Sequence, residues 1–305
     1  MKKSWIVSSI LIGCAIFTAG IAFSLLGHDK QPDYSKTPVL FVHGHGLDAK
    51  NWNRMIEIFM QGNYAEEYLL AVQIQPNRMA NINAAKEFLH PAMKKLLQQS
   101  QQAARLSGKK DIHIDKINIV SHSMGAISSR WLANKIAPER INALIGIAPA
   151  NHGTNALCSH TDPGGREMCP AFAQNVTESF VQVELNGTVD HPIDETPYGI
   201  GIDRLTASRV APDQSKAIFY FTIRIEPDKW IKPEHSSLLD GAGGANPVVS
   251  EHMTETTPGN YLFTAIDVNG ARIDHENLLE DERLIRFVSQ LLSASQAPHK
   301  LTDNL

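Results

Sequence analysis

The sequence predicts one large α/β domain built on a mostly parallel sheet. Short apolar runs typical of buried strands alternate along the chain with stretches of helical periodicity. Of the 305 residues, 43% are hydrophobic and 20% charged, a composition that can bury a large single core. Because strands separated by helices usually pair in parallel, we expect helices on both faces of the sheet. We find no internal repeats and no low-complexity tracts.

The elements follow in order along the chain. Apolar runs predict strands within 38–44, 69–75, 116–120, 140–150, 216–225 and 260–268. Helical spacing predicts helices within 51–62, 82–105, 126–136 and 282–292, the second of them kinked or broken near Pro91. The segment 152–213 interrupts the alternation and is rich in Gly, Pro and Thr, so we interpret it as a cap inserted over the sheet.

The N-terminus has the pattern of an export signal. Two lysines precede the uncharged and mostly apolar segment 4–26. A cleaved signal peptide and a retained membrane anchor both fit this segment, and a lipoprotein box ending at Cys14 is a third, less favoured alternative. Each alternative places the domain outside the cytoplasm, secreted or periplasmic. The expected organisation is 1–27 signal or anchor, 28–36 linker, 37–296 catalytic domain and 297–305 tail.

Charge and cysteine content restrict the partners. The formal net charge of -4 provides no basic field for nucleic acid, which we exclude as a partner. Cys158 and Cys169 lie close together in a loop-like segment, and export favours a disulfide between them over two free thiols. No CxxC spacing is present, so no metal site is predicted, and His152 and His160 are expected at the surface.

A nucleophile elbow is the strongest motif. Ser121-His122-Ser123-Met124-Gly125 follows a strand-like run and precedes a helical pattern, which is the strand-turn-helix context of G-x-S-x-G. Small residues two positions before and after Ser123 let the strand and helix approach closely. An ordinary helix N-cap is the alternative interpretation of the serines.

A serine hydroxyl needs a base that is oriented by an acid, in the chain order Ser, Asp, His. His275 lies between the last strand and the last helix, and we prefer it to His252 as the base. For the acid we prefer Asp228, which directly follows a strand, to Asp240 in a Gly-rich segment.

Backbone amides are suited to stabilising the oxyanion that forms when a serine attacks a carbonyl. The His-Gly pair after the first predicted strand supplies one turn, and the elbow supplies another. We therefore expect the amides of His45 and Met124 to form the oxyanion hole, with His43 as a structural hydrogen-bonding residue.

The chain resembles α/β-hydrolase-fold bacterial lipases and esterases of the lipase class 2 (triacylglycerol lipase) group, over most of residues 38–290. The resemblance rests on "PVLFVHGHG", "NIVSHSMG", "IAPANHGT", "TIRIEPDKWIKP" and "IDHENLL". It implies that Asp228 is the acid of a D-x-x-V-x-P type motif, which the sequence after Asp240 lacks. The elbow departs from the family pattern at Ser121, where a glycine is usual.

The motifs and the resemblance together imply a serine hydrolase of carboxylic esters that needs no metal or organic cofactor. Phe172 and Phe180 in the cap, with Trp230, are candidate lining residues for an apolar acyl chain, or simply cap core. A polyester depolymerase, amidase or transacylase on the same fold is one alternative function. A non-catalytic exported binding or helper module is another. The oligomeric state is left open.

Overall fold

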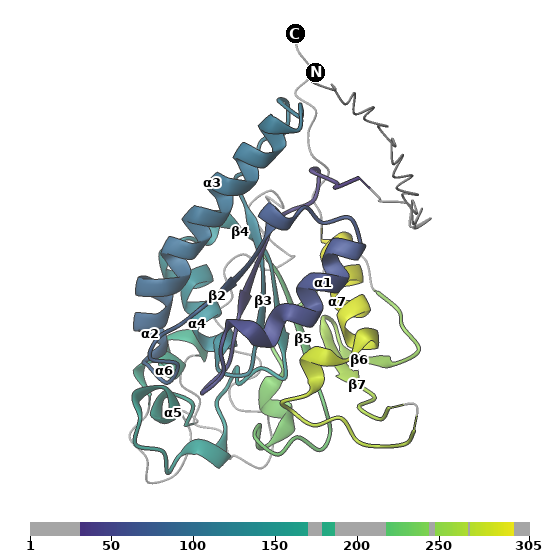
Figure 1. Cartoon of the computed structure of the whole chain (residues 1–305). Coiled ribbons are helices and arrows are strands. Elements are labelled where there is room, and N and C mark those ends of the chain that lie inside the picture. Colours follow the sequence, from purple (N-terminus) through teal and green to yellow (C-terminus); the bar gives the residue numbers. More distant parts are fainter. Residues whose placement is uncertain (1–30, 170–178, 187–217, 244–247, 268, 296–305) are drawn as a thin grey trace, which may run out of the picture. The chain divides into compact units, whose positions relative to one another are not determined.

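The computed structural model describes residues 31–169, 179–186, 218–243, 248–267 and 269–295, which all belong to the compact unit Gln31–Leu305 (Figure 1). Their centre is a seven-stranded sheet in the order β2-β1-β3-β4-β5-β7-β6. The strands are β1 (Val39–Val42), β2 (Leu69–Val72), β3 (Ile117–His122), β4 (Ile141–Ile147), β5 (Phe219–Arg224), β6 (Met253–Thr257) and β7 (Asn260–Phe263). Every neighbouring pair is parallel except β6 and β7.

The central strands are buried because helices cover both faces of the sheet. Both β3 and β4 are buried at every position, as expected for parallel strands between two helical layers. On one face, α1 (Asn53–Gln61) and α7 (Glu282–Ala294) pack over a core that includes Phe41 and Phe287. On the other, α3 (His90–Leu106) and α4 (Gly125–Trp131) pack over Leu40 and Leu144. This architecture confirms the predicted α/β-hydrolase fold.

The helix expected at 82–105 is not broken at Pro91, but its geometry departs from that of an α-helix just before this residue. Helical residues run from α2 (Asn81–Asn83) through a π-helical stretch, Ala84–Leu89, into α3 without interruption. Pro91 is the second residue of α3, which directly follows the π-helical stretch, so it lies inside the helical run. The wider π turn immediately before it absorbs the irregularity that the proline introduces.

The strand β6 was not predicted. It forms an antiparallel edge with β7, and only its first residue, Met253, is buried. An edge strand with one side in solvent does not need an apolar run, so the polar sequence Thr-Glu-Thr-Thr carried no strand signal.

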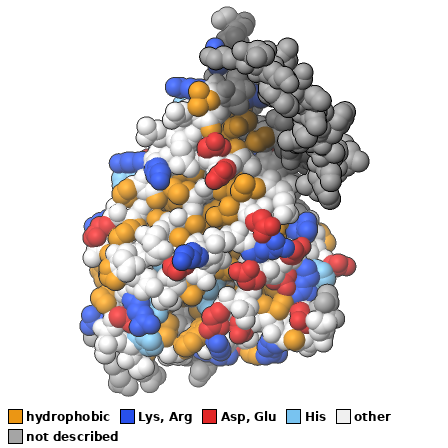
Figure 2. All heavy atoms as spheres, in the orientation of Figure 1, with side chains coloured by type: hydrophobic (Ala, Val, Ile, Leu, Met, Phe, Trp, Pro, Cys, Tyr) orange, Lys and Arg blue, Asp and Glu red, His pale blue; other side chains and the backbone are white. Residues whose placement is uncertain are grey.

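The cap prediction falls partly within the described residues. That part contains α5 (Pro163–Glu167) and α6 (Phe180–Asn186), and the rest, with Phe172, lies outside them. The N-terminal segment 4–26 also lies outside. Within the described ranges, no helix combines the length and the apolar character needed to cross a membrane. Acidic and basic side chains are interspersed on the face shown in Figure 2.

Candidate active site

The elbow joins β3 to α4 at the carboxyl end of the sheet. Ser123 has a φ of 53°, the left-handed conformation that a sharp strand-to-helix turn requires. Backbone hydrogen bonds hold this turn against the next strand: the Ser123 amide donates to the Ile147 carbonyl at 3.0 Å, and the Ser123 carbonyl accepts from Ala150. The central strands of the sheet therefore fix the backbone position of Ser123.

Small residues on both sides of Ser123 have a steric reason. A Cβ on Gly125 would lie 2.6 Å from the His43 carbonyl oxygen and 2.7 Å from that of Val42, so only glycine lets α4 start this close to β1. A Cβ on Gly44 would lie 2.9 Å from Cβ of Ser123. Ser121 replaces the usual glycine without penalty, because its buried hydroxyl donates to the Ile145 carbonyl at 3.2 Å.

The predicted acid and base form a buried pair. His275 Nδ1 lies 2.8 Å from Asp228 Oδ2, and the side chains are only 5% and 2% exposed. The other carboxylate oxygen, Oδ1, accepts hydrogen bonds from the amides of Trp230 at 2.8 Å and Ile231 at 3.1 Å. These bonds orient the carboxylate, so that one oxygen faces the imidazole and leaves its Nε2 free of the proton.

The two alternative residues lie elsewhere. Asp240 is exposed in a turn. The Nδ1 atom of His275 is hydrogen-bonded to Asp228 instead. His252 is half-buried, and its Nε2 lies 3.1 Å from the Glu251 carboxylate. The geometry therefore brings together Asp228 and His275, the residues that we preferred from the sequence.

His122 links the elbow to the loop that carries His275, a role that the sequence did not suggest. Its Nε2 lies 3.0 Å from the carbonyl oxygen of His275, and the two rings are 4.6 Å apart. Because a carbonyl can only accept, Nε2 must carry the proton. Complete burial is the main cause that lowers the pKa of His122 well below its ordinary value, and the proximity of the His275 imidazole adds to the effect. The residue is therefore neutral, and it fixes the base loop against the elbow.

The two amides expected at the oxyanion hole have no acceptor among the described residues. Neither the His45 nor the Met124 amide donates a hydrogen bond to another described group. Both follow directly from strand ends, β1 and β3, that are neighbours in the sheet. His43 is held by both ring nitrogens, with Nδ1 2.9 Å from the Gly44 carbonyl oxygen and Nε2 3.1 Å from the Ile74 amide. It is therefore a structural residue, as expected.

The side chain of His45 points away from this role and toward the disulfide-closed loop. Its Nε2 lies 2.8 Å from Asp162 Oδ1. Asp162 is the N-cap of α5 and accepts from the Gly165 amide at 2.8 Å. Partial burial disfavours the charged carboxylate, but the bonds from Gly165 and His45 outweigh this effect and lower the pKa of Asp162 to about 2. His160 lies beside the pair, and these three residues are the group among the described residues able to ligate a metal.

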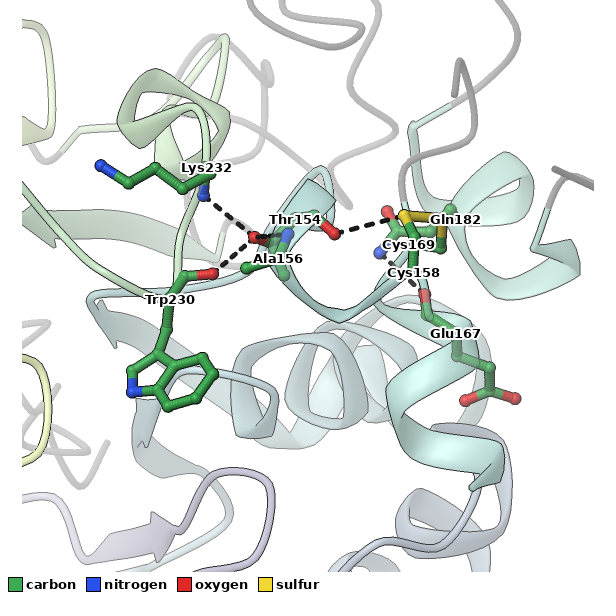
Figure 3. Close-up of a disulfide and its surroundings, with 8 residues drawn as sticks. All are labelled: Thr154, Ala156, Cys158, Glu167, Cys169, Gln182, Trp230 and Lys232. Atoms are coloured by element: carbon green, nitrogen blue, oxygen red, sulfur yellow. Dashed lines mark hydrogen bonds between the residues drawn. A yellow bond between two sulfur atoms is a disulfide. The ribbon is translucent and has the colours of Figure 1, made fainter. Parts of the chain in front are cut away.

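The segment after β4 supports the acid loop and the disulfide together (Figure 3). The Thr154 hydroxyl donates to the Trp230 carbonyl and accepts from the Lys232 amide at 2.9 Å. The Cys158–Cys169 disulfide is present, which confirms that prediction. The expectation of an exposed His152 was wrong: it is 1% exposed, and its Nδ1 lies 2.8 Å from the Ser236 carbonyl oxygen.

A buried arginine, missed by the sequence analysis, completes this support. The Arg130 guanidinium on α4 is fully buried and donates to the carbonyls of Asn151 and Leu185 and to Oδ1 of Asn186. It thereby connects α4 to the segment after β4 and to α6. A lone arginine within a helical pattern is usually solvated, so the sequence carried no signal for this position.

Two of the candidate lining residues are described. Phe180 is 64% exposed on α6 and lies near the ring of Trp131, with centroids 6.1 Å apart. Trp230 is 37% exposed, and its indole nitrogen donates to Glu276 Oε1. Both rings thus present apolar surface to solvent, but from different elements.

Comparisons with known proteins identify a family and similar folds. Residues 36–188, half of the chain, match the family model described as Lipase (class 2). Among solved structures, lipase B of Aspergillus fumigatus is similar with a TM-score of 0.52 and 14% identity, over 86% of this chain and 54% of that chain. Lipase BlEst2 of Bacillus licheniformis in its mature form gives a TM-score of 0.49 and 14% identity, over 86% and 94%. No curated protein matches the chain.

The structural likeness at this identity supports the fold alone, and the chain spans about half the length, 54%, of the Aspergillus lipase. The family match is independent of it and covers residues 36–188, which include the elbow and the turn after β1. The chain therefore belongs to the class 2 lipase family.

Proposed function

We propose that this chain is a serine hydrolase that cleaves carboxylic esters through an acyl-enzyme on Ser123. One observation carries the proposal: Ser123 is the left-handed residue of the elbow, its sequence neighbour His122 hydrogen-bonds the carbonyl of His275, and His275 forms a buried pair with Asp228. Nucleophile, base and acid then occur in the chain order of this fold.

In the first half of the reaction, His275 Nε2 takes the proton of the Ser123 hydroxyl as the oxygen attacks the ester carbonyl. Asp228 holds the Nδ1 proton and stabilises the imidazolium that forms. The amides of His45 and Met124 donate to the oxyanion, which they can do without breaking a described hydrogen bond. Collapse of the tetrahedral intermediate expels the alcohol, which receives the proton from His275.

In the second half, water takes the place of the alcohol. His275 removes a proton from the water as the water oxygen attacks the acyl-enzyme. His275 then returns the proton to the Ser123 oxygen as the carboxylic acid product is released. Every proton passes through Nε2 of one imidazole. No step of this sequence requires a group that the chain lacks.

The proposed substrate is an acyl ester with an apolar chain, such as a triacylglycerol or a related lipid. Family membership supports this class. Apolar surface at Phe180 and Trp230 is compatible with it.

The decisive experiment measures the acyl-enzyme as well as turnover. Full-length protein is assayed with p-nitrophenyl esters from acetyl to palmitoyl, and it is separately treated with an alkyl phosphonate that labels activated serines. We expect one phosphonate per chain, attached to Ser123, and a loss of turnover on the order of 10⁶-fold in Ser123→Ala. The optimum of the ester series separates esterase from lipase.

Ser121→Ala provides the matched control, since that hydroxyl is also buried in the elbow but is engaged by the Ile145 carbonyl. It should remain labelled and active. A folded parent that neither hydrolyses any ester nor reacts with the phosphonate would refute the proposal and favour a binding or helper module.

A further inference from the structure

Three side chains that could ligate a metal ion lie together at the turn after β1. His45 comes from the turn after β1, and His160 and Asp162 come from the loop that the disulfide closes. His45 Nε2 lies 2.8 Å from Asp162 Oδ1, and His160 Nδ1 lies 3.4 Å from Asp162 Oδ2. All three ligand atoms are within 4.8 Å of one another.

The donor set has a chemical preference. Two imidazole nitrogens and one carboxylate suit Zn²⁺ and similar divalent transition ions, whereas Ca²⁺ and Mg²⁺ prefer oxygen ligands. Tetrahedral coordination at about 2.0–2.1 Å places ligand atoms about 3.4 Å apart. The separations in the cluster bracket this value, so small side-chain rotations suffice to bring the three atoms around one ion.

The surroundings are compatible with a bound cation. The side chains of His45 and Asp162 are 11% and 22% exposed, and that of His160 is 36% exposed, so water can reach a fourth position. The bond from the Gly165 amide to Asp162 Oδ1 need not be lost, because a carboxylate has about four lone-pair sites. The cap of α5 and a metal bond can therefore coexist on one carboxylate.

We propose that His45, His160 and Asp162 bind one Zn²⁺-type cation, with water as a fourth ligand. The bound ion cross-links the turn after β1 to the disulfide-closed loop. His45 and Asp162 are 117 positions apart, so no local sequence motif predicts this site. The binding is independent of the chemistry proposed for Ser123, and each stands or fails separately.

Binding is measured on untagged full-length protein after treatment with EDTA and dialysis. Titration with ZnCl₂ by calorimetry should give one site per chain. Zinc at a hundredfold excess over its Kd should raise Tm by about 5 °C. Co²⁺ should give the intense visible absorption of a tetrahedral site. Neither CaCl₂ nor MgCl₂ should raise Tm comparably.

Variants test the assignment of the ligands. His160→Gln and Asp162→Asn should each weaken zinc binding on the order of 10–100-fold and abolish the Co²⁺ spectrum. Asp162→Asn keeps an oxygen for the Gly165 amide, and melting without zinc tests whether each variant is folded. His113→Gln is the control. This exposed histidine precedes β3 and so lies toward the amino ends of the parallel strands, whereas the turn after β1 lies at their carboxyl ends.

The outcomes are distinguishable. Loss of binding in the two ligand variants, with parent-like binding in His113→Gln, supports the site. A parent that binds no zinc at micromolar concentration, or folded ligand variants that bind zinc as tightly as the parent, overturns it. Because calorimetry and Co²⁺ absorption do not require turnover, an inactive enzyme would not affect the result.

Discussion

The substitution Asp228→Asn tests the acid most directly, because the structure fixes how an asparagine would lie. Oδ1 of Asp228 accepts from two backbone amides, those of Trp230 and Ile231. An asparagine must therefore keep its carbonyl oxygen on that side, since a flipped amide would face two N–H donors with its own N–H₂ group. The amide nitrogen of the asparagine then faces His275 Nδ1, which in the parent protein lies 2.8 Å from a carboxylate oxygen of Asp228.

The consequence is a change of tautomer in the base. An N–H₂ donor opposite Nδ1 forces the His275 proton onto Nε2, where it blocks removal of the Ser123 proton. We expect kcat for p-nitrophenyl butyrate to fall by about 10⁴-fold, which corresponds to about 5.5 kcal/mol of lost transition-state stabilisation. The KM should change little, because Asp228 is buried behind the imidazole and is 2% exposed.

Steady-state kinetics and thermal melting of the parent, Asp228→Asn and Asp240→Asn separate the alternatives. The Asp240 variant removes an exposed carboxylate and should remain within about twofold of the parent. A folded Asp228→Asn protein that loses less than tenfold in kcat, or an Asp240→Asn protein that loses as much, would refute the assignment of the acid.

Three further predictions concern stability. Because the pKa of His122 is lowered in the folded state, the unfolded chain binds more protons than the folded chain below about pH 6.5, and the free energy of unfolding falls as the pH falls. His122→Gln should therefore reduce this loss by about 1.4 kcal/mol per pH unit, as measured by urea unfolding at several pH values. Gly125→Ala should cost about 1–3 kcal/mol in the same assay, because its Cβ would lie 2.6 Å from the His43 carbonyl oxygen. Replacing Cys158 and Cys169 by serine together should cost about 3 kcal/mol, since the disulfide closes a loop with a separation of 11 residues.

Each of these has a contradicting result. An unchanged pH slope in His122→Gln would mean that this imidazole titrates alike in both states. A Gly125→Ala protein as stable as the parent would mean that β1 and α4 are not in close contact. Equal stability with and without the disulfide would place its loop outside the cooperative unit.

Much of the sheet could be predicted because its strands are buried on both faces. Mostly apolar runs such as 117–120 and 141–147 are typical of strands that helices cover on both faces. The polar edge strand β6 could not be found in this way, since one side of it needs no apolar residues. The irregularity expected near Pro91 takes the form of a π-helical stretch, which the sequence alone does not distinguish from a kink or a break.

The site was predictable where a motif constrains the backbone and less so where tertiary contacts decide. Ser123 stands in a steric pattern that leaves few alternatives, and the short distance from β5 favoured Asp228. The burial of His152 and the pairing of His45 with Asp162 depend on partners 84 and 117 positions away. No local pattern encodes such partners, so His152, which we expected at the surface, proved to be buried.

Hydrogen bonds hold together the segments that carry the proposed catalytic residues. His122 attaches the base loop to the elbow through the His275 carbonyl, and it does so from the position next to the nucleophile. Thr154 attaches the acid loop, through both the Trp230 carbonyl and the Lys232 amide, to the segment that follows β4. That segment is itself bonded to the elbow by the Ala150 amide. The segments that carry Ser123, His275 and Asp228 are thus held together by hydrogen bonds between side chains and backbone groups, and positioning of this kind lowers the cost of aligning the three residues during the proposed reaction.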